Sequence, residues 1–168
     1  MKKTLCTILV LLSMTSISWA SSGPYIGAAP TVTRLEVNDF SDVQAGYRVV
    51  GGWRLNENFA FEGSWQDLGG FKDDGFKVDL DGFTAEFLAI APQFDGLNFF
   101  GKVGYFDFTL KEIGFTGDQA EDGLLLGVGL MGDLSNNIGV SLEVNWADAV
   151  DDVVFGALTF RWYFLGPN

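Results

Sequence analysis

Hydrophobic and polar residues alternate along most of this chain, in short runs that break at Gly, Asn, Asp and Ser. A period of two places successive side chains on opposite faces of an extended strand, and such turn residues end strands. After the first 20 residues, no segment stays apolar for the about 18 positions that indicate a membrane-spanning helix. The pattern predicts eight strands, near residues 24–33, 42–54, 58–67, 80–91, 97–109, 123–132, 138–147 and 153–164.

Most of these strands have one apolar and one polar face. The run 138–147 is the clearest, because Ile138 and Trp146 share one parity while Glu143 takes the other. Every mid-strand charge falls on the parity that also carries glycines and small polar residues. The phase of the first run and of the three leucines at 124–126 is ambiguous.

The connections between the predicted strands alternate in length. Those after the second, fourth and sixth strands are brief, and the others are mostly longer and richer in charge. Strands of ~9–11 residues span a membrane, and outer-membrane barrels have short periplasmic turns and longer outer loops. An even number of strands brings both ends to the periplasmic side. The predicted fold class is all-β, an eight-stranded antiparallel up-and-down transmembrane β-barrel.

Large aromatic residues lie on the apolar parity, mostly near strand ends, where interfacial girdles are found. An Arg or Lys that faces lipid at mid-depth costs ~2–4 kcal/mol, so membrane insertion requires charges on the other parity. The predicted lipid-facing aromatics are Tyr47, Trp53, Phe59, Trp65, Trp146, Trp162 and Phe164. The alternative is a soluble barrel whose apolar parity faces inward, with Tyr47, Phe61, Phe87, Phe99, Val103 and Val140 in its core.

An eight-stranded lumen is only wide enough for side chains, so the inward charges should meet. With turn midpoints as register guides, Glu86 falls opposite Lys102, Glu62 comes close to Glu86, and Arg48 lies one diagonal from Glu62. Charges away from water are tolerated when they are paired. The predicted lumen charge network comprises Arg48, Glu62, Glu86, Lys102, Glu143 and Arg161. It is either a structural cluster that fills the lumen or a gate whose re-pairing opens a narrow ion path.

The first 20 residues have the features of a secretory signal peptide. Lys2 and Lys3 precede an apolar run over 5–12, and the segment ends with small residues at Ser18 and Ala20. We therefore predict cleavage after Ala20, with residues 1–20 as signal peptide and 21–168 as one outer-membrane β-barrel domain. The expected location is the outer membrane of a bacterial cell.

The amino-acid composition limits the functions that this chain can perform. The chain has 168 residues, a formal net charge of −12 and no His. The absence of imidazole removes the usual base and metal ligand, and the single cysteine, Cys6, lies in the predicted signal peptide. A strongly acidic chain is a poor partner for nucleic acid. We expect no cofactor, no catalytic residues, no metal site and no enzymatic activity.

The ends of the predicted barrel resemble a known family. The segment Gly23-Pro24-Tyr25-Ile26-Gly27-Ala28 opens it, and Phe155-Gly156-Ala157-Leu158-Thr159-Phe160-Arg161-Trp162-Tyr163-Phe164 closes it. These segments and the overall pattern resemble the small OmpA-type outer-membrane β-barrels, OmpA-like or OmpX-like, over essentially all of residues 21–168. The resemblance implies a barrel domain alone, inserted by the outer-membrane assembly machinery, with Phe164 as the terminal aromatic. It also implies outer-membrane lipid and lipopolysaccharide as surroundings.

The predicted outer loops are acidic, with 15 Asp and Glu against four Lys and Arg. They form either a solvated rim that limits adhesion or a weak site for divalent cations, which prefer oxygen ligands. Three functions therefore stay open: a structural or surface-interaction barrel with a closed lumen, a narrow porin-like channel, and a soluble periplasmic barrel for an apolar ligand. The sequence identifies no extracellular ligand.

Overall fold

The computed structural model describes residues 22–37, 40–73, 76–113, 119–148 and 153–164. Every long segment of these ranges is extended, because the alternating sequence favours strands and the connecting residues favour turns. The eight strands are β1 (Gly23–Val37), β2 (Phe40–Arg54), β3 (Phe59–Asp73), β4 (Phe76–Ile90), β5 (Asn98–Ile113), β6 (Gln119–Ser135), β7 (Ile138–Ala147) and β8 (Val153–Tyr163).

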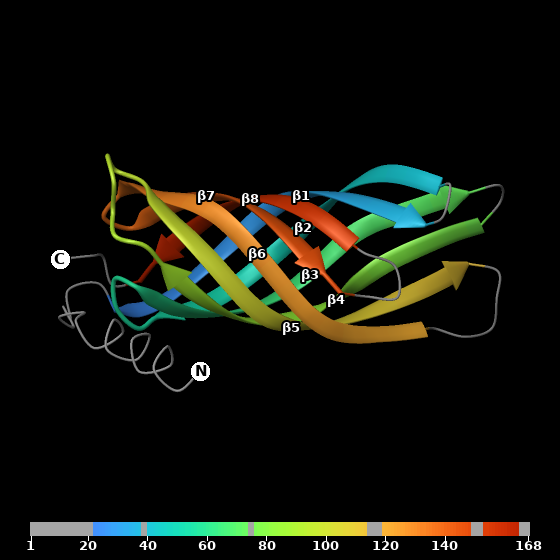
Figure 1. Ribbon diagram of the computed structural model, residues 1–168, viewed down its shortest axis with the longest axis horizontal. Coiled ribbons are helices and arrows are strands. Elements are labelled where there is room, and N and C mark those ends of the chain that lie inside the picture. Colours follow the sequence, from blue (N-terminus) through green and yellow to red (C-terminus); the bar gives the residue numbers. More distant parts are fainter. Residues whose placement is uncertain (1–21, 38–39, 74–75, 114–118, 149–152, 165–168) are drawn as a thin grey trace, which may run out of the picture.

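The strands form one closed barrel (Figure 1). Each strand pairs antiparallel with its neighbours in sequence, and β8 closes the barrel by pairing with β1. The predicted fold, an all-β, eight-stranded, up-and-down antiparallel barrel, is confirmed. Within the described ranges, no helix is long and apolar enough to cross a membrane.

The strands continue beyond their predicted ends at one end of the barrel. Pairing between β1 and β2 runs to Val37 and Phe40, and pairing between β3 and β4 runs to Asp73 and Phe76. The sequence predicts loops there, because these segments are rich in charge. The backbone groups of a hairpin satisfy each other whatever the side chains are, so the ladder continues. We call the end of the barrel that carries these extended hairpins the loop end. The opposite end, where β1 begins and β8 ends, is the short-turn end (Figure 1).

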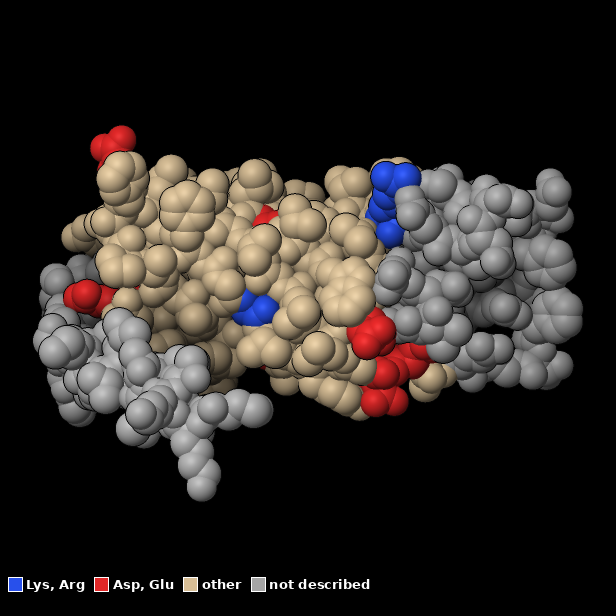
Figure 2. Space-filling model, in the orientation of Figure 1, with Lys and Arg blue, Asp and Glu red and all other residues tan. Residues whose placement is uncertain are grey.

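Side-chain direction separates the two faces of the wall. The exposed fraction is 52% for Phe61, 60% for Phe99 and 46% for Val103, so the apolar parity faces outward. This contradicts the soluble-barrel alternative, which needs those side chains in the core. Figure 2 shows that charged residues are sparse along the middle of the described wall and lie mainly toward its ends. In the ambiguous run at 124–126, the middle leucine, Leu125, is the one that points inward.

The interior is arranged in layers. One buried apolar cluster lies toward the loop end and contains Leu68, Leu80, Phe106, Phe108, Leu125, Ala147, Val153 and Phe155. Two further clusters lie toward the short-turn end, one with Ala60, Leu88, Ile90, Phe100 and Met131, the other with Tyr25, Val50 and Tyr163. Buried charged residues occupy the strand positions between them.

Candidate functional site: a charge network inside the barrel

Six of the eight strands each contribute one charged residue to the interior. All six residues occupy inward positions of the alternating pattern and are at most 5% exposed. They are Arg48 from β2, Glu62 from β3, Glu86 from β4, Lys102 from β5, Glu143 from β7 and Arg161 from β8. These are the six residues of the predicted network, and the fold brings all of them into the lumen.

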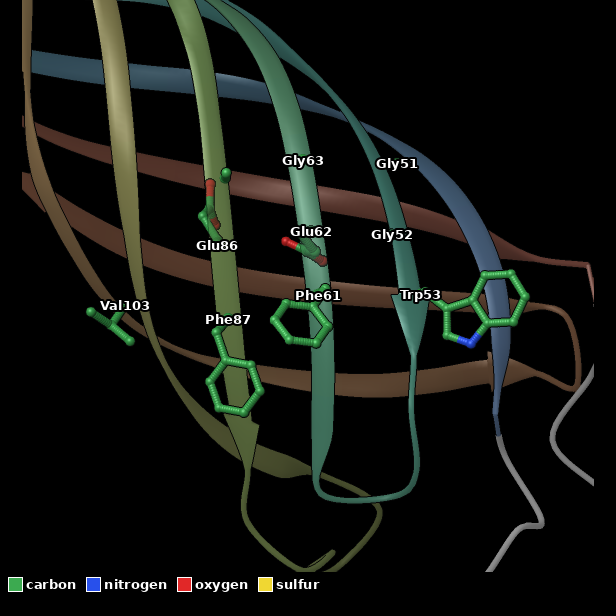
Figure 3. Close-up of a pocket in the computed structure, with 10 residues that line it drawn as sticks. Gly51, Gly52, Trp53, Phe61, Glu62, Gly63, Glu86, Phe87 and Val103 are labelled. Carbon is green, nitrogen blue, oxygen red and sulfur yellow. The ribbon is translucent and has the colours of Figure 1, made fainter.

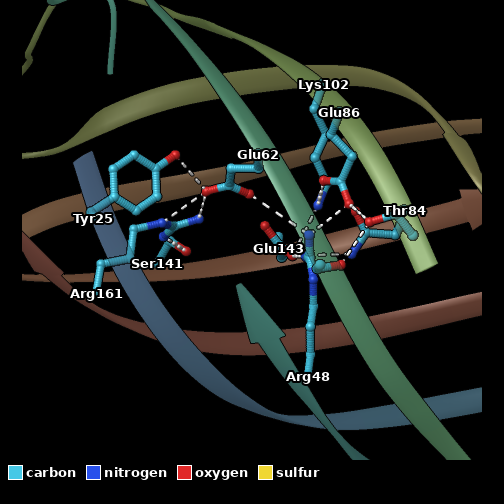
Figure 4. Close-up of polar contacts among 11 residues, drawn as sticks. Tyr25, Arg48, Glu62, Thr84, Glu86, Lys102, Ser141, Glu143 and Arg161 are labelled. Atoms are coloured by element: carbon cyan, nitrogen blue, oxygen red, sulfur yellow. Dashed lines mark hydrogen bonds and ion pairs between the residues drawn. The ribbon is translucent and has the colours of Figure 1, made fainter. Parts of the chain in front are cut away.

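Four of these residues form one half of the network (Figure 4). The Arg48 guanidinium donates to Glu143, and its Nη2 lies 2.6 Å from Glu86 Oε1. Lys102 Nζ lies 2.7 Å from Glu86 Oε2 and 3.0 Å from Glu143 Oε1. Each cation therefore bridges the same two carboxylates, one on β4 and one on β7, across the lumen.

The other half is centred on Glu62 (Figure 4). Its Oε1 accepts hydrogen bonds from Arg161 Nε at 3.0 Å, from Arg161 Nη2 at 2.8 Å and from the Tyr25 hydroxyl at 2.9 Å. Arg161 also donates to the Ser141 hydroxyl. The other oxygen, Glu62 Oε2, lies 3.7 Å from Arg48 Nη2, which joins the two halves into one network.

The network has no net charge, because three cations face three carboxylates. The side chains of these ion pairs are at most 3% exposed. Charges removed from water this completely depend on one another: deleting one partner of a buried pair leaves an uncompensated charge. The six side chains can therefore fill the lumen as one electrically neutral network of ion pairs.

The strand registers differ in part from the prediction. Glu62 is directly paired with Glu86, as expected. Glu86 is paired with Gly104 rather than Lys102, which lies two residues earlier in β5, opposite Leu88. Arg48 is paired with Gln66, not one diagonal from Glu62. Long side chains close these gaps, so the contacts form although the positions are offset.

Several uncharged residues complete the network and were not predicted as part of it. Thr84 donates to Glu86, Asn145 Nδ2 lies 3.3 Å from Glu143 Oε1, and Tyr25 and Ser141 bind as described above. All four residues lie on the inward parity of their strands. Alternation in the sequence predicts the inward direction of Thr84, Ser141 and Asn145. It does not predict the direction of Tyr25, because the phase of the first strand is ambiguous.

Glycines on the inward face make room for the larger groups. A Cβ at Gly104 would approach Glu86 Cγ to 2.8 Å and the backbone oxygen of Ala85 to 2.5 Å. A Cβ at Gly127 would meet the Lys102 side chain, with Cγ at 2.8 Å. A large side chain on one strand thus lies over a glycine on the next, which is how a lumen this narrow accommodates the charges.

The seven aromatic residues predicted to face lipid all lie on the outward parity. Tyr47, Trp53 and Trp162 are 50–53% exposed, and Phe164 is 54% exposed. Phe59, Trp65 and Trp146 are half-buried among outward neighbours. Tyr47 and Trp65 meet edge to face, with ring centroids 5.5 Å apart.

Some predictions concern parts of the chain outside this description. The predicted signal peptide, residues 1–20, lies outside the described residues, as do the side chains of most of the acidic loop residues. Among the side chains that are described, no group of three or more Asp, Glu, His or Cys could hold a metal ion.

Comparison with known proteins identifies the fold. No protein-family model matches the chain, and no curated protein matches it significantly. Among solved structures, Neisserial surface protein A has a TM-score of 0.71 at 14% identity, over 85% of this chain and 98% of that one. The attachment invasion locus protein Ail of Yersinia pestis, solved with the heparin analogue sucrose octasulfate, has a TM-score of 0.65 at 14% identity over the same shares.

The outer membrane protein OprG from Pseudomonas aeruginosa is a third match. Its TM-score is 0.57 at 11% identity, and the alignment covers 88% of this chain and all of that one (100%). Identities this low carry the fold and not the function. The chain has the closed eight-stranded fold of the small outer-membrane β-barrels, as the sequence resemblance implied.

Proposed function

We propose that this protein is an integral outer-membrane β-barrel with a structural or surface-interaction role and a closed lumen. The observation that carries the proposal is the division of the wall into an apolar outer face and an interior with a neutral charge network. Outward positions such as Phe83, 64% exposed, and Val128, 66% exposed, suit hydrocarbon. A charge at such positions would cost ~2–4 kcal/mol at the bilayer midplane.

The layers of the interior support closure. Along the strands, an ion would meet the apolar cluster at the loop end, then the paired charges, then the apolar clusters near the short turns. Phe106 and Phe108 are at most 1% exposed and pack against each other within the first cluster, with ring centroids 4.6 Å apart. An ion crossing such a layer would lose its hydration without gaining ligands, which is strongly unfavourable.

The surroundings of the barrel follow from the same proposal. Outer-membrane lipid and lipopolysaccharide would contact the outward aromatics, and the outer-membrane assembly machinery would insert the chain. The proposal includes no catalytic step. At the surface, the acidic predicted loops disfavour a polyanionic partner such as the sulfated sugar bound to Ail.

Membrane insertion and closure are tested together. Isolated outer membranes are run on a gel with and without boiling, and the purified barrel is added to planar bilayers. We expect outer-membrane recovery, a heat-dependent mobility shift and no single-channel current. Recovery in the periplasm without detergent would overturn the proposal.

A variant of the charge network tests closure of the lumen separately from membrane insertion. In Lys102→Ala, Glu86 and Glu143 each lose one cationic partner, and Arg48 remains between them. If the apolar layers seal the lumen, this variant stays silent in the bilayer. A steady current from Lys102→Ala, or from the wild type, would instead support the narrow channel in which re-pairing opens a path.

A further inference from the structure

The outer face of the barrel is hollowed over β2, β3 and β4. The hollow has a volume of about 570 Å³, within the ~300–1,000 Å³ range of small-molecule sites. Its lining includes Gly51, Gly63 and Ala85. Glu62 and Glu86 also line it, but their carboxylates turn into the lumen toward Arg161 and Lys102.

Three small residues form its floor. Gly51 is paired with Gly63, and Gly63 is paired with Ala85, so the three stand side by side on adjacent strands. A Cβ at Gly51 would have no described heavy atom within 4 Å, and one at Gly63 would approach the Thr84 oxygen to 3.8 Å. Packing within the barrel therefore does not require glycine there. Gly inside a strand weakens it and often marks a place where another group approaches the backbone.

Large side chains form walls on both sides of this floor. On the short-turn side, Trp53, Phe61, Phe87 and Val103 are paired across four strands and run in a row (Figure 3). The rings of Phe61 and Phe87 are 5.1 Å apart. On the loop side, a second row is formed by Val49, Trp65 and Phe83. A trough thus crosses the strands between two rows of mostly aromatic residues, and the short-turn row lines it directly.

We propose that this trough binds one acyl chain of a membrane phospholipid. The proposal rests on membrane insertion as proposed above, since hydrocarbon then surrounds this face. The side chains that enclose the trough present hydrocarbon and ring faces, which complement an alkyl chain. A second barrel is convex, so it would touch the wall rows before it reached the recessed floor, whereas a thin flexible chain reaches it.

The depth of the trough selects the kind of lipid. Gly51 is three residues from the end of β2, and Gly63 is four residues from the start of β3, so the floor lies toward the short turns. With short turns on the periplasmic side, this depth belongs to the inner leaflet of the outer membrane. That leaflet is built of phospholipid, and lipopolysaccharide occupies the other.

Native mass spectrometry tests the proposal on the refolded full barrel in detergent mixed with phosphatidylethanolamine. The variant Gly51→Val/Gly63→Val fills the floor with side chains that strands favour. The matched control is Gly156→Val, on the outward face of β8, where a Cβ would meet the Glu143 backbone oxygen at 3.7 Å. We expect the wild type and the control to retain one phospholipid. The double variant should lose retention about tenfold, as expected when about two methylene groups lose their contacts.

Each other outcome contradicts the proposal in a distinct way. Equal retention by all three proteins would mean that the trough holds no lipid. Dimers of the wild type that the double variant alone abolishes would identify a second copy as the occupant. A heat-dependent gel shift of all three proteins establishes that each forms the membrane barrel, so failure of the trough is distinguished from failure of membrane insertion.

Discussion

At the scale of single residues, Glu62 is the most informative member of the lumen network. It accepts hydrogen bonds from Arg161 and Tyr25, and it links them to Arg48. In Glu62→Leu, the Arg161 guanidinium stays buried without its carboxylate, so the free energy of unfolding should fall by about 3–5 kcal/mol. Adding Arg161→Leu removes the stranded charge and should restore part of that stability. Urea unfolding of the barrel in lipid vesicles measures both variants.

The control for this cycle is Thr159→Val. Thr159 is fully buried (0% exposed), and its hydroxyl makes no hydrogen bond among the described residues. Its replacement by an apolar residue of similar shape should be neutral or stabilising, because no partner is left unsatisfied. If the double Glu62→Leu/Arg161→Leu variant were as unstable as Glu62→Leu alone, the stranded guanidinium would not be the cause of the loss.

The members of the network could be predicted from alternation, but their partners could not. Parity alone puts Arg48 and Glu143 on the inner face. Their contact joins β2 to β7, which are not neighbours in the sheet. Register concerns adjacent strands, whereas this contact depends on closure of the barrel and on the length of the arginine side chain. The sequence pattern therefore identifies which residues face the lumen, but it does not determine which of them contact one another.

At the scale of the strand pair, packing depends on a large residue lying over a small one. Glu86 on β4 is paired with Gly104 on β5, and a Cβ at Gly104 would approach the Ala85 backbone oxygen to 2.5 Å. Gly104→Ala should therefore lower the free energy of unfolding by about 1–3 kcal/mol, the usual cost of overpacking. Gly51→Ala, on the outward face with open space around it, should raise stability by about 0.5–1 kcal/mol, because glycine weakens a strand. Urea unfolding compares the two variants, and equal effects would contradict the pairing argument.

The sequence contains a local signal for the position of the turn between β4 and β5, and the midpoint of the connection does not use it. Asp95 and Gly96 both have positive φ, 52° and 83°, as the two central residues of a type I′ hairpin turn require. Phe94 and Leu97 flank them as a bridge pair. The midpoint of the segment 92–96 lies one residue too early, and that error moved Lys102 by two positions. The Asp-Gly pair locates the turn. A turn centred between Asp95 and Gly96 would nevertheless put Glu86 opposite Tyr105, and the irregular segment 91–93 shifts the strand pairing by one residue, to Glu86 opposite Gly104.

At the scale of the whole molecule, the apolar layers of the interior were only partly foreseen. The sequence pattern predicts a polar lumen, yet large aromatic residues such as Phe100, Phe106 and Tyr163 are buried in it as well. It did not predict that Leu68 and Leu80 join Phe106 in one layer near the loop end. These residues come from segments treated as strand ends or loops, because their neighbours are charged. Leu68 lies one residue beyond the predicted strand 58–67, and extension of β3 to Asp73 brings it into the interior, whereas Leu80 is the first residue of the predicted strand 80–91.

The barrel has two chemically different ends, and its orientation in the membrane can be measured. With Cys6→Ser as background, the chain has no thiol, and single cysteines can be placed at Asn136 in the turn between β6 and β7 and at Asp148 beyond β7. Both residues are exposed. If the short turns face the periplasm, a membrane-impermeant maleimide added to intact cells should label Asp148→Cys. It should label Asn136→Cys after the outer membrane is permeabilised. Labelling of Asn136→Cys alone in intact cells would reverse the orientation, and the trough would then lie in the lipopolysaccharide leaflet.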